Sequence, residues 1–269
     1  MRAETHAEKG KVYLVGAGPG DPELLTVRAL RLLQSADVVF HDDLVPDEVL
    51  ALAGRETLVT SVGKRCGRPK ITQQGIHKLM VDSARAGQSV VRLKSGDPLI
   101  FGRAGEEIAA LDRAGVAFEV VPGVTAALAA GASLSLPLTD RASASKLIFV
   151  TGHHAADKEP RKPVWEGSLP ADATLVIYMP GRDLGRLQRE LADAGMAPGT
   201  PVAAVSHAAT ERQSFVAGRL DAMSDLRPGP APLLVLAGAA MERLLGDGEE
   251  LGPVIREAAF GLAEALESL

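Results

Sequence analysis

Short apolar runs alternate with amphipathic stretches along the first half of the chain. The first run, residues 12–15, is followed by a glycine-rich turn and then, from Thr26, by apolar residues spaced three or four positions apart. The same order of strand, turn and helix repeats to about residue 134. We expect strands at 12–15, 37–40, 58–62, 89–93 and 116–121, and helices at 26–33, 46–53, 72–86, 105–114 and 124–134.

In the second half of the chain strands predominate. We expect strands at 147–151, 174–179, 202–206, 214–218 and 233–237, and one helix at 184–194. Alternating strands and helices indicate βαβ units and a mostly parallel sheet, so the expected fold class is α/β. A length of 269 residues suits about two domains. We place two α/β domains at 11–140 and 141–246, with a disordered tail at 1–10 and a helical tail at 247–269.

Composition restricts the class of protein without identifying a function. Hydrophobic residues make up 46% and charged residues 23% of the chain, which excludes disorder over most of its length. A net charge of −5 argues against a dedicated nucleic-acid binder. No apolar run approaches the ~18 residues of a membrane span. Because the chain has a single cysteine and a polar start, we expect a cytoplasmic protein without a disulfide.

The glycine-rich turn at 16–20 invites comparison with dinucleotide-binding loops. Those loops have the spacing G-x-G-x-x-G, whereas here the third glycine comes one position early and Pro19 lacks a backbone N–H for a phosphate. No Gly-Lys-Ser/Thr follows, which excludes a P-loop. The turn is therefore either an ordinary link between strand and helix or the binding loop for a different ligand.

Three further turns follow expected strands and carry glycine or polar residues. Segment 92–103 contains Ser-Gly-Asp-Pro, segment 121–127 leads from Pro-Gly into a helix of small residues, and segment 62–65 carries two cations. Each is ordinary turn chemistry by itself. In open α/β sheets, however, ligands bind at the carboxyl ends of the strands, where these turns are expected to lie.

Taken together, these segments resemble the tetrapyrrole methyltransferase family, and most of all its uroporphyrinogen-III C-methyltransferases. The similarity extends from about residue 11 to 243, and the motifs occur in the family's order. They lie at 15–22, 36–45, 62–65, 92–107, 121–126, 136–139 and 149–153. The resemblance implies two α/β domains with the active site in the cleft between them, usually in a homodimer, and S-adenosylmethionine as the methyl donor.

The family's binding residues can be carried over position by position. Those implied to bind S-adenosylmethionine are Pro19, Ser95, Gly96, Asp97, Ile100, Thr125, Ala126, Met179 and Ala208. The small residues among them would let the backbone approach a bulky ligand. The tetrapyrrole substrate carries many carboxylates, which suit the planar fork of arginine. The candidates are Arg65, Arg92 and Arg141. No metal is implied, and neither a nucleic acid nor a membrane is an expected partner.

The implied reaction transfers methyl groups to two pyrrole carbons of uroporphyrinogen III and gives precorrin-2 by way of precorrin-1. The ring carbon is the nucleophile, so the protein has to align the reactants and remove a proton after alkylation. The resemblance implies Asp42 as proton acceptor and Lys64 as proton donor. Two simpler roles stay open, Asp42 as a helix cap and Lys64 as a cation for a substrate carboxylate. With the three arginines, Lys64 is expected to concentrate positive charge in one cleft.

Departures from the family's pattern concern the substrate side. The family commonly has Tyr-Asp-Arg where this chain has His41, Asp42 and Asp43, and a histidine where it has Asp140. Another precorrin methyltransferase of the same fold and a non-catalytic ligand-binding regulator are therefore the alternatives. The six histidines do not have the spacing of a metal site.

Overall fold

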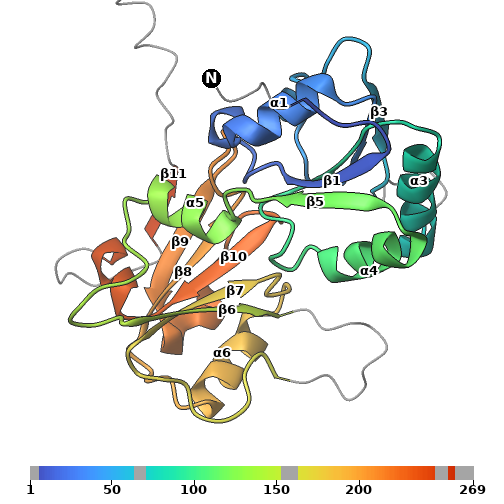
Figure 1. Ribbon diagram of the computed structural model, residues 1–269. Coiled ribbons are helices and arrows are strands. Elements are labelled where there is room, and N and C mark those ends of the chain that lie inside the picture. The colour runs from blue at the N-terminus through green and yellow to red at the C-terminus, as the bar shows by residue number, and fades with distance from the viewer. Residues whose placement is uncertain (1–5, 64–70, 153–162, 246–253, 258–269) are drawn as a thin grey trace, which may run out of the picture. The chain divides into compact units, whose positions relative to one another are not determined.

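The chain folds into two units, each built around one sheet (Figure 1). The computed structural model describes residues 6–63, 71–152, 163–245 and 254–257. The two units divide between Ala126 and Ala127. Both combine strands with helices, which confirms the α/β fold class.

The first unit contains a five-stranded sheet in the order β3-β2-β4-β1-β5, in which every pair is parallel. The carboxyl ends of all its strands therefore meet at one edge. Its strands are β1 (Lys11–Gly16), β2 (Val38–His41), β3 (Leu58–Ser61), β4 (Val90–Lys94) and β5 (Ala117–Val121). Its helices are α1 (Val27–Ser35), α2 (Asp47–Leu50), α3 (Gln73–Arg85) and α4 (Ala104–Ala114), with a short 3-10 turn at Pro22–Leu24.

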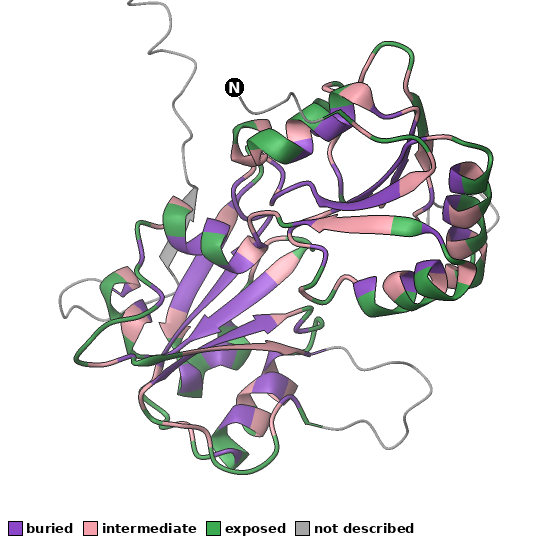
Figure 2. Cartoon of the chain, viewed as in Figure 1, coloured by how far each residue is buried: buried purple, intermediate pink, exposed green. Residues whose placement is uncertain are grey.

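Helices cover both faces of this sheet, which explains why its central strands read as continuous apolar runs. In β1, Tyr13 and Val15 pack in the cluster that contains α1 residues, and Val12 and Leu14 pack in the cluster that contains residues of α3 and α4. Successive side chains of a strand point to opposite faces, so both sets are buried. Figure 2 shows the central strands buried and the covering helices exposed on their outer sides. The expected elements of this half occur within a few residues of their predicted bounds.

The start of the chain differs from the disordered tail expected at 1–10. Residues 1–5 lie outside the described part, but from Ala7 on the backbone is held against the first unit. The N–H of Ala7 donates to Ser35 Oγ at 2.9 Å, and the N–H of Gly10 donates to the carbonyl of Gln88 at 3.0 Å. These contacts add an ordered segment in front of β1.

The second unit contains a six-stranded sheet in the order β11-β9-β8-β10-β7-β6. Its strands are β6 (Lys146–Thr151), β7 (Ala173–Tyr178), β8 (Pro201–Ser206), β9 (Ser214–Arg219), β10 (Leu233–Ala237) and β11 (Val254–Glu257), and its helices are α5 (Ala126–Ser133), α6 (Leu184–Asp193) and the 3-10 segments η2 (Leu220–Asp225) and η3 (Ala239–Leu244). Among the strands described in this unit, only β6 and β7 pair in parallel. The mostly parallel sheet predicted from the alternation in the first half is confirmed in the first unit. In the second unit, β8 and β9 pair antiparallel because the connection between them is too short for a crossover.

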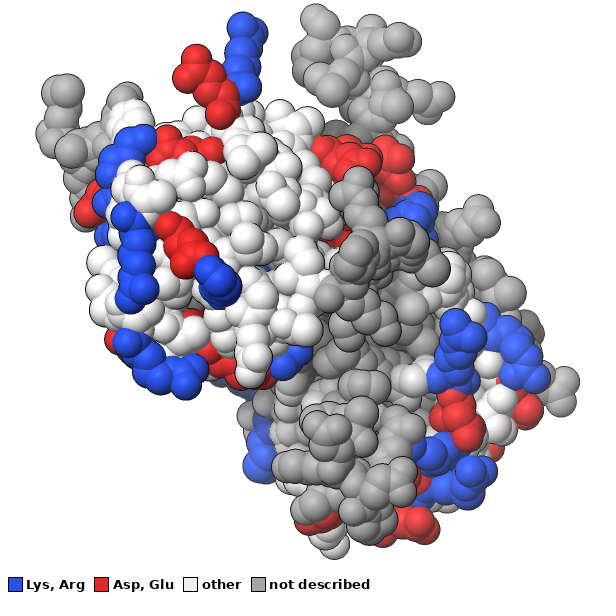
Figure 3. Space-filling view, turned by 90° about the vertical axis from the view of Figure 1, so that its right-hand side faces the viewer, with Lys and Arg blue, Asp and Glu red and all other residues white. Residues whose placement is uncertain are grey.

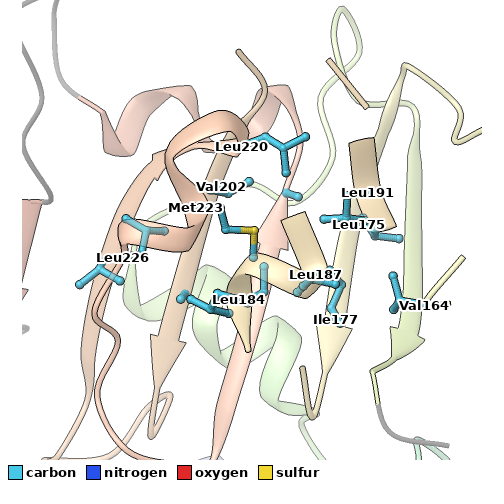
Figure 4. Packing of buried hydrophobic residues seen from close by; sticks show 14 residues of the cluster. Val164, Leu175, Ile177, Leu184, Leu187, Leu191, Val202, Leu220, Met223 and Leu226 are labelled. Atoms are coloured by element: carbon cyan, nitrogen blue, oxygen red, sulfur yellow. The ribbon is translucent and has the colours of Figure 1, made fainter. Parts of the chain in front are cut away.

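An apolar cluster fills one face of the second sheet. Figure 4 shows Leu184, Leu187 and Leu191 of α6 together with Leu175 and Ile177 of β7. The leucines recur at helical spacing, so one face of α6 is buried.

Two expectations about the second half differ from the structure. The predicted boundary at 140/141 lies beyond α5, which belongs to the second unit; the N–H of Ala127 donates to Tyr178 Oη at 3.2 Å, at the end of β7. The predicted helical tail at 247–269 is wrong for residues 254–257, which form β11 and pair antiparallel with β9. Within the described residues, no helix is long and apolar enough to cross a bilayer.

Candidate functional site

Three loops of the first unit join at the carboxyl edge of its sheet, where they follow β1, β4 and β5. Gly18 and Gly96 exchange backbone hydrogen bonds, with N···O distances of 3.2 and 2.7 Å. The N–H of Gly123 donates to Asp97 Oδ2 at 3.0 Å. These bonds hold the loops together, so the three segments that the sequence singled out form one surface.

Glycines in these loops serve two different purposes. A Cβ atom on Gly16 would lie 2.6 Å from Gly123 Cα, and one on Gly123 would lie 2.3 Å from the carbonyl oxygen of Gly96, so both glycines are required by close packing. A Cβ on Gly96 would meet nothing closer than Thr125 Cα at 3.8 Å. Gly96 has a left-handed φ of 68°, and space remains beside it. Gly96 is buried and its N–H and carbonyl are both bonded to Gly18, so glycine at this position serves the left-handed turn rather than close packing.

Most of the predicted donor-binding residues lie in these three loops. They are Pro19 after β1, Ser95, Gly96, Asp97 and Ile100 after β4, and Thr125 and Ala126 after β5. The Asp97 carboxylate also shapes its own loop, because its Oδ1 accepts from the N–H of Leu99 at 2.8 Å. Both of its oxygens thus have backbone partners, which fixes the carboxylate in position.

The other two predicted donor-binding residues, Met179 and Ala208, belong to the second unit. They follow β7 and β8, which both pair antiparallel with β10 and so end at the same edge of the second sheet. Met179, His207 and Ala209 have left-handed φ angles of 49°, 49° and 55°. Such backbone in residues other than glycine is costly and clusters at functional sites.

A buried glutamine fixes the loop after β8, and the sequence did not single it out. Gln213 is 3% exposed, and its Oε1 accepts from the N–H of Ala209 at 2.6 Å. Thr210 Oγ1 donates to the carbonyl of His207 at 2.8 Å. These two bonds support the left-handed residues on both sides of Ala208.

Four ionised side chains form a cluster beneath the carboxyl edge of the first sheet. Arg92 donates through Nη2 to Asp42 Oδ1 and through Nε to Glu107 Oε1, the latter at 3.0 Å. Lys94 Nζ lies 3.0 Å from Glu107 Oε2 and 4.0 Å from Asp42 Oδ2. Arg92 and Lys94 alternate along β4 and so point to the same face, towards the buried side of α4.

Only one member of this ionic cluster (Asp42, Arg92, Lys94, Glu107) reaches the surface. The side chains of Arg92, Lys94 and Glu107 are 2%, 3% and 0% exposed, whereas that of Asp42 is 35% exposed. Burial lowers the pKa of Lys94, and the nearby charge of Arg92 lowers it further. The cluster therefore presents one carboxylate, that of Asp42, at the surface next to the glycine loops, and the buried guanidinium of Arg92 holds it in place.

The structure also decides the simpler alternative for Asp42. Helix α2 begins at Asp47 after Pro46, and no side chain caps it. The carboxylate of Asp42 is thus not a helix cap. Its main partner is Arg92.

The other predicted substrate-side residues lie outside the described residues or in the second unit. Lys64 and Arg65 lie outside the described residues. Arg141 is exposed in a turn of the second unit in which Asp140 Oδ1 accepts from the N–H groups of Ala142 and Ser143, both at 2.9 Å. The gathering of these cations in one cleft stays a prediction. On the face in Figure 3, basic and acidic residues are interspersed.

Glu107 is the member of the cluster that sequence reasoning missed. It stands in the first turn of α4 beside Glu106, where acidic residues are ordinary because they complement the helix dipole. A second signal was available, because Ala104, Glu107 and Leu111 share the apolar face of that helix. A charged residue on such a face needs a buried partner of opposite sign. Among the described residues, no three or more His, Cys, Asp or Glu side chains are grouped so as to hold a metal.

Comparison with known proteins gives these features a context. Residues 11–224 match the family of Tetrapyrrole (Corrin/Porphyrin) Methylases. A siroheme synthase of Psychrobacter sp. is 47% identical over 232 residues, which cover 85% of this chain and 47% of that protein. The chain thus spans about half the length of the curated relatives it matches.

Solved structures agree over most of the chain. Uroporphyrin-III C-methyltransferase from Thermus thermophilus is 41% identical with a TM-score of 0.74, covering 87% of this chain and 97% of that one. A structure of the Thermus protein complexed with S-adenyl homocysteine is 40% identical, with a TM-score of 0.72 and coverage of 87% and 99%. The match to the family model covers more than half of the chain and agrees with the fold and the glycine loops described above. The chain belongs to the tetrapyrrole (corrin/porphyrin) methylases.

Proposed function

We propose that the protein transfers methyl groups from S-adenosylmethionine to uroporphyrinogen III and produces precorrin-2 through precorrin-1. The observation that carries the proposal is the placement of Asp42. Its carboxylate reaches the surface and is held by buried Arg92, and it lies at the same sheet edge as the glycine loops. The similarity to uroporphyrin-III C-methyltransferase at 41% identity supports this substrate over others of the family.

The residues of the first unit fit a bulky donor. The carboxylate of Asp97 is fixed by backbone N–H groups, and the small residues Gly96 and Ala126 leave no large side chain in the way. Met179 and Ala208 are the contacts proposed from the second unit. When bound, S-adenosylmethionine supplies an electrophilic methyl group. The relative complexed with S-adenyl homocysteine supports a donor of this kind.

Asp42 is the proposed proton acceptor. Alkylation of an electron-rich pyrrole carbon leaves a proton to be removed, and a positioned carboxylate within reach of it serves that purpose. Arg92 holds Oδ1 of this carboxylate, which leaves the exposed side of Asp42 for the substrate. Lys64 is the proposed proton donor.

Arg92 itself is poorly placed to bind a substrate carboxylate. It is 2% exposed, and its guanidinium donates to Asp42, to Glu107 and to the carbonyl of Leu93 at 3.2 Å. Arg65 and the exposed Arg141 are therefore the proposed substrate-binding arginines, with Arg92 acting through Asp42.

The test uses labelled donor and the acceptor itself. Purified protein is incubated with methyl-labelled S-adenosylmethionine and enzymatically generated uroporphyrinogen III, and the products are separated and weighed by mass spectrometry. We expect a tetrapyrrole that carries two labelled methyl groups. Label on a later precorrin but none on uroporphyrinogen III would favour another precorrin methyltransferase. Donor binding without turnover on any tetrapyrrole would favour the ligand-binding regulator.

A further inference from the structure

Glu107 is the centre of the ionic cluster, although it lies farther from the surface than the other three members. It is 0% exposed on α4 and contacts both buried cations, with Arg92 Nε and Lys94 Nζ at 3.0 Å from its two oxygens. Gln73 of α3 adds a weak contact, with Nε2 at 3.5 Å from Glu107 Oε1. The buried carboxylate of Glu107 thus holds both Arg92 and Lys94, which are two positions apart on β4.

The charges of the cluster balance only because Glu107 is present. The cluster pairs two basic side chains, Arg92 and Lys94, with two acidic ones, Asp42 and Glu107. Without Glu107, Asp42 would be the one carboxylate of the cluster beside two buried basic groups. Nearby positive charge favours the ionised form of a carboxyl group and makes it a weaker base.

We infer that Glu107 is a positioning residue for methyl transfer: it holds Arg92 and Lys94 in place and offsets one of their charges, so that Asp42 is both fixed and basic enough to accept a proton. The inference rests on the proposed function for its catalytic meaning. Its electrostatic content concerns this chain alone and can be measured without any substrate.

Other groups around Asp42 do not replace this role. His41 Nδ1 lies 3.0 Å from the backbone carbonyl oxygen of Asp42, so this contact is with the backbone of Asp42 and not with its carboxylate. On α3, the pKa of His77 is lowered by burial, which favours its neutral form. Glu106 is exposed and pairs with Arg103 at 2.8 Å. Glu107 is the anion that contacts Arg92 and Lys94 from the side opposite Asp42.

The experiment follows the ionisation of Asp42 by carbon-13 NMR of aspartate-labelled protein, with the signal assigned by its loss in Asp42→Asn. Glu107→Gln keeps the shape of the side chain and removes its charge, so we expect Asp42 to titrate about one pH unit lower. Lys94→Met should move the titration the other way. Lys94→Met/Glu107→Gln removes one charge of each sign and should return it close to wild type. Glu106→Gln, a change of the same kind one residue away, should leave it unchanged.

Turnover supplies the second readout. We expect Glu107→Gln to lower kcat about tenfold while the Kd for S-adenosylhomocysteine stays within twofold of wild type, and Glu107→Asp, which keeps the charge, to recover part of kcat. If Glu107→Gln does not fold, the difference in Asp42 titration between Lys94→Met and the double variant still measures the effect of Glu107.

The inference is overturned if Asp42 titrates at the same pH in all of these proteins, or if Glu107→Gln folds and keeps a wild-type kcat. Wild-type protein that does not methylate uroporphyrinogen III would instead refute the proposed function. The NMR titration would then still decide whether Glu107 sets the ionisation of Asp42.

Discussion

Two aspartates flank the same strand and are held in opposite ways. Asp37 precedes β2, at the amino edge of the first sheet, and its Oδ2 accepts from both the N–H and the Oγ of Ser89 at 2.7 Å. Its Oδ1 pairs with exposed Lys9 at 2.6 Å. Asp42 follows β2, at the carboxyl edge, and its described side-chain partners are the buried cations Arg92 and Lys94.

The difference separates a structural contact from one that we propose to be functional. Asp37 joins the starts of β2 and β4 with a backbone group, a hydroxyl and an exposed lysine, none of which needs a charge to be buried. The contact between Asp42 and Arg92, by contrast, belongs to a cluster with three buried ionisable side chains, those of Arg92, Lys94 and Glu107. Burying charges is costly, and replacing a buried ion pair by apolar residues is often neutral or stabilising. Stability alone therefore does not explain the cluster at the carboxyl edge, whereas a need for a positioned carboxylate does.

The largest effect on stability is expected from Arg92→Leu. The change leaves the buried carboxylate of Glu107 with Lys94 as its remaining cation, and removing one partner from a buried ionic group typically costs about 3–5 kcal/mol. Urea denaturation followed by circular dichroism measures it. A loss below about 1 kcal/mol would show that the cluster is no more tightly coupled than a surface pair.

A smaller and pH-dependent effect is expected from Asp37→Asn. Hydrogen bonds from Lys9 and Ser89 hold the pKa of Asp37 at about 2, below its usual 3.8. Because the folded pKa is depressed, the stabilisation is complete above about pH 4 and is lost as the pH falls towards 2. After screening by solvent we expect about 1 kcal/mol at neutral pH. Urea denaturation of both proteins between pH 2 and 7 measures the difference, and a gap that is constant over this range contradicts the assignment.

The smallest effect is expected from Glu106→Gln on α4. Glu106 and Arg103 are 51% and 57% exposed, and pairs of this kind contribute less than about 1 kcal/mol. Thermal unfolding should therefore barely distinguish this variant from wild type, although it differs from Glu107→Gln by a single position. An equal loss in the two variants would mean that burial does not control the cost of losing the charge.

The amphipathic pattern was sufficient to predict most helices and strands, and the sheet edge at which the proposed site lies. Strand-loop-helix repeats predicted the parallel sheet, and the loops after β1, β4 and β5 lie together at its carboxyl edge. The antiparallel pairing in the second unit was missed, because periodicity identifies a strand without indicating its neighbours. Strand β11 was missed because its apolar residues also fit helical spacing.

Side-chain partners were harder to predict than elements. Arg92 and Lys94 alternate along β4 and therefore share one face of the sheet. Because β4 is buried on both faces, these two cations need buried acidic partners. Which acidic residue supplies them depends on how α4 packs, and the spacing of Glu107 with Ala104 and Leu111 was the one sign in the sequence that it is buried and Glu106 is not. Arg92 was accordingly predicted to bind substrate, whereas its guanidinium is occupied by Asp42 and Glu107.

The most direct test compares turnover of uroporphyrinogen III by Asp42→Asn and Asp37→Asn in one assay, at equal saturation with S-adenosylmethionine. The two variants make the same chemical change at the two ends of β2. Asp37→Asn should methylate at a rate within about twofold of wild type, and Asp42→Asn should be slower by about 10²- to 10⁴-fold with donor affinity unchanged. If Asp42→Asn turns over as fast as Asp37→Asn, the carboxylate at the carboxyl edge is not the proton acceptor.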